Sequence, residues 1–284
     1  MWDRDAVAAR ARRMRADIVE MIAEAGSGHP GGSLSAADIV ATLYFGDVLR
    51  HDPARPDWPE RDRFILSKGH AAPVLYSALA EAGYFGRDHL HTLRKLGSIL
   101  QGHPDCKKTP GVEVSTGSLG QGLSISCGLA AGLRGGDHPG NVTGDRTVFC
   151  LLGDGEIQEG QVWEAAMFAA HESLGNLVAI VDHNGLQIDG ACTEVMCLGT
   201  VADKFRAFDW HVVEIDGHDI DAVHDALLTA KAYADGPVMI VAHTIKGKGV
   251  SFMEGEAGWH GKAPSAAKVK TAFAELGIDE GSLA

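Results

Sequence analysis

The stretch from Thr147 to Leu186 constrains the fold more than any other part of the sequence. Two short apolar runs stand at its ends, and apolar residues recur at helical spacing from Glu159 to His171 between them. This pattern predicts a strand, a helix and a second strand. Because such crossovers are right-handed and place both strands in one sheet, their carboxyl ends meet at the same edge. Asp154 and Asn184, which follow the two runs, are therefore expected to lie side by side.

The residue types at this edge indicate a cation and diphosphate site. An Asp carboxylate and an Asn amide oxygen are hard ligands that suit Mg²⁺ or Ca²⁺ better than zinc. Gly153 and Gly155 leave out side chains where a diphosphate would approach the backbone, and the helix start that follows offers free amide donors. Taken alone, however, Gly-Asp-Gly is explained equally well by an ordinary aspartate in a turn.

Other segments extend the same alternation of strands and helices. Helices are expected at Asp5 to Ala25, Ala71 to Ala82, Leu119 to Leu133, Asp219 to Ala234 and Ser265 to Leu276, and strands at Arg63 to Leu66, Trp210 to Ile215 and Val238 to His243. The helix at 119–133 and the last two strands are expected to be buried. We predict an α/β fold, a doubly wound and mostly parallel sheet with helices on both faces. A single domain spans 1–284, with a C-terminal extension from about residue 246.

The segment between the first helix and the next one carries two further expectations. Gly26 to Gly32 contains too many glycines for a regular element and is expected to form a loop. Ser35 and Asp38, three residues apart, match a capping box and predict a helix that begins there and continues to about Phe45 or Leu49.

Composition limits the environment and the partners of the chain. Its 284 residues are 45% hydrophobic, which suffices for a large core. The 38 acidic and 25 basic residues give a net charge of −13, which argues against nucleic acid or an anionic membrane as a partner. Five cysteines without a C-x-x-C pair, no signal-like N-terminus and no apolar run of membrane-spanning length favour a soluble protein of the reducing cytoplasm.

Several motifs together resemble one enzyme family. The sequence Gly-Asp-Gly-Glu-Ile-Gln-Glu-Gly at 153–160, with an Asn about thirty residues after the Asp, resembles the thiamine diphosphate motif in its transketolase form. Gly-His-Pro-Gly-Gly at 28–32, Ser-Lys-Gly-His at 67–70, Gly-His-Pro at 102–104 and Trp-His-Gly at 259–261 are similar to further segments of the transketolases. The resemblance extends over nearly the whole chain.

The resemblance implies thiamine diphosphate and Mg²⁺ as cofactors, with Ca²⁺ or Mn²⁺ as possible substitutes. The implied metal ligands are Asp154, Asn184 and the backbone oxygen of Leu186. The implied cofactor contacts are His70, Gly117, Ser118, Leu119, Gly153, Asp154, Gly155, Asn184 and His260. The implied catalytic residues are His29, His103, His260 and Glu159. Many relatives have proline at the position of Ser118, and His183 stands where the wider family often has a second Asn.

Simpler interpretations of the histidines remain open. His29 is explained as a loop residue without a role, and His70 as a residue at the start of a helix. His103 and Cys106 form no zinc site, because no second pair of ligands stands at the required spacing.

The resemblance also implies that part of the active site lies on another chain. In transketolases, the glutamate and the aromatic residues that contact the aminopyrimidine ring lie on a second domain, contributed by the neighbouring subunit. We expect this chain to be the N-terminal subunit of a split transketolase that works with a separate chain, in a heterotetramer with two copies of each. Glu159 is expected to meet the partner's glutamate at the interface. The substrates are expected to be small sugar phosphates.

Two alternatives stay open at this point. Another thiamine diphosphate enzyme, similar to deoxyxylulose-phosphate synthase or to an α-keto acid dehydrogenase component, would also carry Gly-Asp-Gly and Asn. A non-catalytic paralogue that serves as a scaffold is the second alternative. The histidine set favours ketol transfer, and the intact metal ligands weigh against the scaffold.

Overall fold

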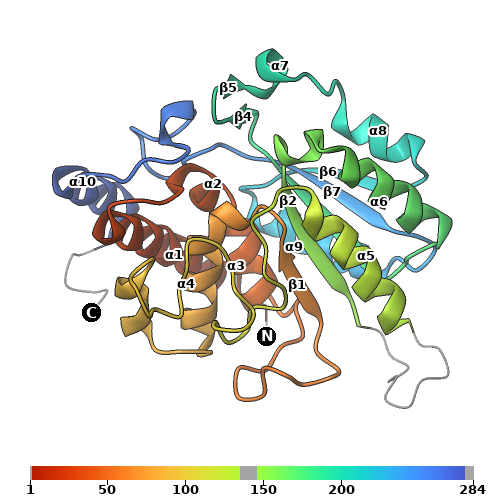
Figure 1. Cartoon of the computed structure of the whole chain (residues 1–284), viewed down its shortest axis with the longest axis horizontal. Coiled ribbons are helices and arrows are strands. Elements are labelled where there is room, and N and C mark those ends of the chain that lie inside the picture. The colour runs from red at the N-terminus through yellow and green to blue at the C-terminus, as the bar shows by residue number, and fades with distance from the viewer. Residues whose placement is uncertain (1, 135–145, 279–284) are drawn as a thin grey trace.

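A parallel sheet of five strands forms the centre of the molecule, as seen in the computed structural model, which describes residues 2–134 and 146–278 (Figure 1). In sheet order, the strands are β1 (Arg63–Leu66), β2 (Val148–Gly153), β3 (Leu177–His183), β7 (Val238–His243) and β6 (His211–Asp216). Every neighbouring pair is parallel. The predicted α/β fold with a mostly parallel sheet is therefore confirmed.

Helices cover both faces of this sheet. On one side, the core is shared with α1 (Arg4–Ala25), α2 (Pro30–Ser35), α3 (Ala37–Phe45), α4 (Ala72–Ala82), α9 (Ile220–Ala232) and α10 (Ala266–Leu276). The other face packs against α5 (Gln121–Leu133), α6 (Gly160–His171) and α8 (Val201–Ala207). Phe149 points to the first layer and Cys150 to the second, because successive side chains of a strand alternate between faces. Strands covered on both sides need apolar residues at every position, which explains the uninterrupted apolar runs of β2 and β3.

Short elements complete the chain. A small hairpin of β4 (Leu186–Gln187) and β5 (Gly190–Ala191) leads into α7 (Cys192–Val195). Short 3₁₀ helices occupy Gly69–Ala71, Arg87–Thr92, Glu156–Gln158 and Ala257–Trp259. After β7 the chain returns to the first layer, where α10 packs beside α1. In the described part of the chain, no helix is both long and apolar enough to cross a membrane.

The predicted loop between α1 and α3 is confirmed only at 26–29, and the predicted capping box is wrong, although the helix expected after it does end at Phe45. α1 does end at Gly26, which adopts a left-handed φ of 64°, but a new helix, α2, begins at Pro30. Proline suits a first helical position, because no hydrogen bond is needed from its nitrogen there. Ser35 is the last residue of α2 and does not cap α3, because its hydroxyl donates to Asp182 Oδ2 at 2.5 Å. Asp38 instead accepts two hydrogen bonds from Arg15, at 2.6 and 3.0 Å.

Two of the predicted buried elements are only partly buried. β6, one of the two edge strands of the sheet, consists of exposed and half-buried residues, whereas the other edge strand, β1, is buried. α5 buries Gly122, Leu123 and Ala130 against the sheet side, whereas Gly128 and Gly132 on its outward side are exposed. β7, by contrast, is buried along most of its length, as expected.

The start of α5 approaches β1 very closely. A Cβ atom added to Gly122 would lie 2.7 Å from Ser67 Cα, which is closer than real Cβ contacts allow. The absence of a side chain at Gly122 therefore lets the helix descend onto the end of β1.

Candidate active site

A cavity of about 360 Å³ lies at the carboxyl ends of β1, β2, β3 and β7. Ligands bind at this edge in open α/β sheets, because the turns after the strands project there. Its lining includes His29, Gly32, Lys68, His70, Gly117, Leu119, Gly153, Asp154, Gly155, Glu156, Gln158, Glu159, Asn184, Leu186, Lys246 and His260. Most of the residues selected from the sequence therefore lie together, although they come from distant parts of the chain.

Asp154 and Asn184 lie next to each other, as the strand-helix-strand unit predicts. Gly153 at the end of β2 pairs with Asp182 of β3. The Asp154 carboxylate accepts hydrogen bonds from the backbone N–H groups of Gly155 and Gly185. Burial, and then the negative charge of Asp182, raise the pKa of Asp154. A nearly buried carboxylate of this kind is stabilised by a cation.

The backbone oxygen of Leu186 faces a lysine that the sequence interpretation left without a role. Lys246 Nζ donates to Leu186 O at 3.1 Å and lies 2.9 Å from Nδ1 of His260. Only 2% of Lys246 is exposed, and this burial lowers its pKa, although the charge of Asp154 opposes the shift. The side chain brings a positive charge to the site where a diphosphate would need one.

Three of the predicted histidines form one cluster in the cavity. The ring of His29 lies 5.4 Å from the rings of both His70 and His260, and these two rings are 5.1 Å apart. Burial lowers the pKa of all three, to about 4 for His29 and about 3 for His260. They are neutral at pH 7, so each ring has one nitrogen that donates and one that accepts. His29 Nδ1 is buried and has no hydrogen-bond partner in the described chain.

The segment from His103 to Leu119 approaches the cluster from the side. Gly117 and Leu119 line the cavity, whereas His103 and Ser118 do not. The His103 ring packs against Gly117, where an added Cβ would lie 2.9 Å from it. Gly117 has a φ of 143°, which disfavours other residues. The pKa of His103 is lowered by burial and then by the charge of Arg94. His103 thus contacts the Gly117 turn that lines the cavity.

Two glutamates of the Gly-Asp-Gly segment have different environments. Glu156 is 2% exposed and accepts hydrogen bonds from the backbone N–H groups of Gly120 and Gly153, each at 3.0 Å. Burial raises its pKa. Glu159, the residue selected from the sequence, is exposed at the start of α6 and also lines the cavity. Glu156 therefore joins the start of α5 to the end of β2, whereas Glu159 is exposed at the surface.

Asp182 connects the segments that carry the site. Its carboxylate accepts hydrogen bonds from Ser35 Oγ, Lys68 Nζ, Thr244 Oγ1 and Asn184 Nδ2. Lys68 Nζ also donates to the carbonyl of Gly32 at 2.7 Å. Burial disfavours the Asp182 carboxylate, but Lys68 and the other donors outweigh it and lower its pKa. One buried group thus links the end of α2 with the turns after β1, β3 and β7.

Lys68, Glu156, Asp182 and Lys246 were not selected as site residues from the sequence. A usable signal was present for Asp182 and Lys246, since each ends or follows an apolar strand run and so falls at the same sheet edge as Asp154. Lys68 stands in the Ser-Lys-Gly-His motif, which indicates a site without separating Lys68 from His70. Glu156 has no local signal that separates it from Glu159.

The donor set fits a divalent cation and a diphosphate. Asp154, Asn184 and the Leu186 carbonyl offer hard oxygens, which Mg²⁺ prefers. Lys246 and the neutral histidines supply donors around them, and the unsatisfied His29 Nδ1 requires a polar partner. Glycines at 153 and 155 keep the adjoining backbone accessible.

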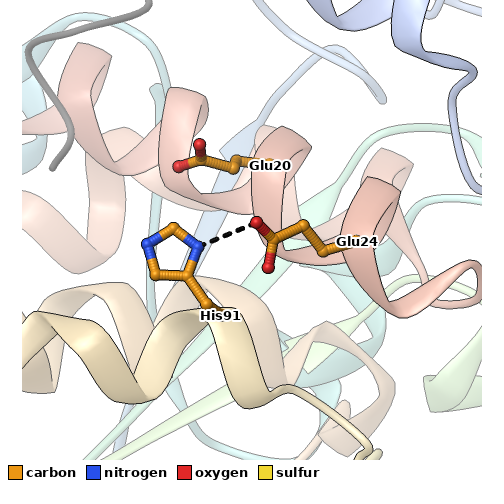
Figure 2. A group of neighbouring side chains, drawn as sticks. All are labelled: Glu20, Glu24 and His91. Atoms are coloured by element: carbon orange, nitrogen blue, oxygen red, sulfur yellow. Dashed lines mark hydrogen bonds and ion pairs between the residues drawn. The ribbon is translucent and has the colours of Figure 1, made fainter.

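A second group of possible metal ligands lies outside the cavity. It comprises Glu20 and Glu24 on α1 and His91 in the turn Arg87–Thr92 (Figure 2). His91 Nδ1 lies 3.0 Å from Glu24 Oε1, and both side chains are 40% exposed. None of the three lines the cavity, so this surface group joins α1 to the turn and is separate from the site.

Comparisons with known proteins agree with this geometry. The family model described as "Transketolase, thiamine diphosphate binding domain" matches residues 5–283. The 6-deoxy-6-sulfo-D-fructose transketolase subunit SqwG of Clostridium sp. (strain MSTE9) is 46% identical over 267 residues, which cover 94% of each chain. An apulose-4-phosphate transketolase subunit of Phocaeicola vulgatus is 40% identical, over 94% of this chain and 92% of that one.

Longer transketolases match over part of their length. Human transketolase is 43% identical over 253 residues, which are 89% of this chain and 39% of the human protein. The crystal structure of Campylobacter jejuni transketolase superposes with a TM-score of 0.88 at 34% identity, covering 96% of this chain and 43% of that chain. The chain thus spans about two fifths of these proteins and nearly all of the two subunits. It belongs to the transketolase family and corresponds to the thiamine diphosphate binding domain of that family.

Proposed function

We propose that this chain is the cofactor-binding subunit of a two-component transketolase, which transfers a two-carbon ketol unit from a ketose donor to an aldose acceptor. The observation that supports it best is the gathering of Asp154, Asn184 and three neutral histidines at one sheet edge, in a chain of this family. Relatives of the same length are named as transketolase subunits.

We assign the metal to Asp154, Asn184 and the Leu186 carbonyl, with Mg²⁺ as the resident ion. Magnesium takes few protein ligands and completes its octahedron with phosphate oxygens and water, which suits a site with three protein oxygens. The Leu186 carbonyl has two lone pairs, so it can accept from Lys246 and still ligate the ion. Lys246 then neutralises part of the diphosphate charge.

Thiamine diphosphate, when bound, supplies the carbon nucleophile and the electron sink that ketol transfer needs. His70, His260 and the backbone from Gly117 through Ser118 to Leu119 hold it, together with Gly153 and Gly155. His29 and His103 handle the hydroxyl and carbonyl oxygens of the substrate. Because the pKa of His29 and that of His103 are lowered, both rings are neutral at pH 7, and each can donate one hydrogen bond and accept another.

A partner subunit completes the site in this proposal. It carries the pyrimidine-binding and C-terminal parts, meets Glu159 at the open side of the cavity and forms a heterotetramer with two copies of each chain. The five cysteine thiols are free, which fits an enzyme of the reducing cytoplasm. The two subunit relatives are named for a sulfo-sugar and a sugar phosphate, and we propose an anionic ketose as the donor here.

Reconstitution tests the function. The chain alone should transfer no ketol units, and addition of the partner with thiamine diphosphate and Mg²⁺ should produce transfer from a ketose phosphate. A panel of phosphorylated and sulfonated ketoses identifies the donor, and pyruvate serves as the alternative substrate. Full turnover by the chain alone, or turnover of pyruvate only, would contradict the proposal. An assembled complex that binds no cofactor would favour the scaffold.

A further inference from the structure

A buried ion pair and a histidine lie outside the cavity, between α1, α3 and the turn that follows β6. Arg15 of α1 donates two hydrogen bonds to the carboxylate of Asp38 on α3, at 2.6 and 3.0 Å. The Oδ2 atom of this carboxylate also lies 2.7 Å from Nδ1 of His218. The three side chains are only 6%, 8% and 12% exposed, and none of them lines the cavity. Burial disfavours the Asp38 carboxylate, but Arg15 and then the hydrogen bond from His218 outweigh it and lower its pKa.

The contacts of His218 determine which of its ring nitrogens carries the proton. Nε2 lies 2.8 Å from the backbone nitrogen of Ile245, and a backbone N–H group can only donate. Nε2 must therefore accept this hydrogen bond, which requires a ring without a proton on Nε2. The proton of the ring then stands on Nδ1 and is donated to Asp38. His218 thus connects the buried ion pair to the backbone after β7 through two directional hydrogen bonds.

The hydrogen bond to Ile245 falls one residue before the lysine of the active site. Lys246 is 2% exposed, and its Nζ atom lies 3.1 Å from the Leu186 carbonyl oxygen and 2.9 Å from Nδ1 of His260. A flexible four-carbon side chain keeps such contacts only where the backbone that carries it is fixed. The bond from Ile245 to His218 therefore bears on the position of the ammonium group.

Residues 245–249, which we call the Lys246 turn, also pack closely against α1 and α2. A Cβ atom added to Gly249 would lie 3.0 Å from Cδ of Arg15, and one added to Gly31 would lie 2.9 Å from Cγ of Lys246. The backbone N–H of Gly247 donates to the Gly31 carbonyl at 3.0 Å. The two helices thus leave the turn little freedom, and the hydrogen bond to the histidine fixes its backbone at one further point.

We propose that His218 is a positioning residue, which holds the backbone of Ile245 so that the ammonium group of Lys246 faces the diphosphate. This inference rests on the proposed function, in which Lys246 neutralises part of the diphosphate charge. His218 acts only through the Lys246 turn, because it does not line the cavity. Without its ring, the Ile245 N–H loses its partner, and conformations in which Nζ leaves the Leu186 carbonyl become populated.

The first measurement needs no cofactor. His218→Ala removes both ring nitrogens, and His171→Ala at the exposed end of α6 is the control. Hydrogen exchange of the Ile245 amide, measured by NMR on the chain, should be about tenfold faster in His218→Ala, because one hydrogen bond is lost. The amide of Val241 in β7 should exchange as in the wild type in both variants, which shows that the fold persists. An unchanged rate at Ile245 in His218→Ala would refute the proposal.

A double-mutant cycle tests whether His218 acts through Lys246. Isothermal titration calorimetry on the assembled enzyme with Mg²⁺ measures Kd for thiamine diphosphate. His218→Ala should raise Kd about tenfold, Lys246→Met about 100-fold, and the double variant no more than about threefold beyond Lys246→Met. A further factor of about ten in the double variant would show that the two residues act independently, and would overturn the proposal.

Chemical rescue separates the two hydrogen bonds from the volume of the ring. Imidazole has one N–H donor and one acceptor and fits the space that His218→Ala leaves, whereas N-methylimidazole has the acceptor alone. Imidazole should return Kd to within about threefold of the wild type, and N-methylimidazole should not. Equal rescue by both compounds would show that only volume matters, and no rescue by either would also count against the hydrogen bonds. If the wild-type enzyme binds no thiamine diphosphate, the proposed function fails, whereas exchange at Ile245 still decides whether His218 holds the turn.

Discussion

At the scale of single residues, the site is defined by histidines that are kept uncharged. Burial lowers the pKa of His29, and Arg94 adds to the effect, while burial and then Lys246 lower that of His260. A cluster of three charged imidazoles within 5.4 Å of each other would repel. Neutral rings instead leave the positive charge of the cavity to Lys68 and Lys246.

This cluster should make stability depend on pH. In the unfolded chain, histidine binds a proton below a pKa of about 6.5, whereas His29 in the folded chain has a pKa of about 4. The unfolded state therefore binds more protons as pH falls, and stability is lost from pH ~6.5 down to ~4. We expect the free energy of unfolding in urea to be lower at pH 5 than at pH 7. His29→Asn should reduce that difference, and the exposed control His171→Asn should not. The same difference in all three proteins would contradict the assignment.

Asp154 is the residue on which cofactor binding should depend most. Asp154→Asn keeps the shape but removes the charge that faces the metal, so we expect Mg²⁺-dependent binding of thiamine diphosphate to weaken by about 100-fold or more. Isothermal titration calorimetry on the assembled enzyme measures it. Asp209→Asn is the control, because Asp209 is exposed and does not line the cavity. This variant should bind the cofactor normally. Unchanged affinity in Asp154→Asn would remove this residue from the ligand set.

At the scale of elements, α5 has one tightly packed face and one open face. Gly122→Ala should destabilise the chain by about 1–3 kcal/mol, because the new methyl group would press against the backbone of Ser67. Gly128→Ala meets nothing within 4 Å and should stabilise the chain by up to about 1 kcal/mol, since alanine favours helix. Urea unfolding of the two variants measures the difference. Equal stabilities would show that the approach of α5 to β1 is not restrictive.

The sequence predicts the central elements well, because their signals are local. β2 is apolar from Val148 to Leu152 and β3 from Leu177 to Val181, and these runs predict the two strands. Ser35 was misassigned because its hydroxyl bonds to Asp182, 147 positions away, and no local pattern reveals such a partner. The exposure of β6 likewise depends on how far other elements cover it in the folded chain, which short-range spacing does not contain.

The candidate site was predictable to the extent that its residues stand in motifs. Asp154, Asn184 and the histidines at 29, 70 and 260 were selected from the sequence, and the structure brings them to one cavity. Their catalytic and binding roles remain predictions. The place of Lys246 after the apolar run of β7 indicates only the sheet edge, whereas its contact with the Leu186 carbonyl is formed across 60 positions and has no local signal.

At the scale of the whole molecule, the five-stranded sheet brings residues from 29 to 260 to a single edge, where the cavity lies. The proposed metal ligands come entirely from this chain. In the proposed enzyme, the cation is therefore held by one of the two polypeptides, although catalysis needs both.

Removal of the metal should accordingly abolish the activity of the assembled enzyme. Dialysis against a chelator should abolish ketol transfer, and Mg²⁺ should restore it. Ca²⁺ and Mn²⁺ should restore part of it, because they also accept oxygen ligands, whereas Zn²⁺ should be ineffective without nitrogen or sulfur ligands. Activity assays paired with elemental analysis of the dialysed sample provide the measurement. Full activity in a sample shown to be metal-free would exclude a role for the cation.

The hydrogen-bond network around Asp182 has a consequence for how such an enzyme diversifies. The donors to that carboxylate described above belong to this chain, so the anchoring of the cation and diphosphate does not depend on the sequence of the other polypeptide. Mutations that reshape sugar recognition can then accumulate in one gene product while the other stays constant. A split architecture of this kind allows new substrates to be acquired by exchanging half of the enzyme.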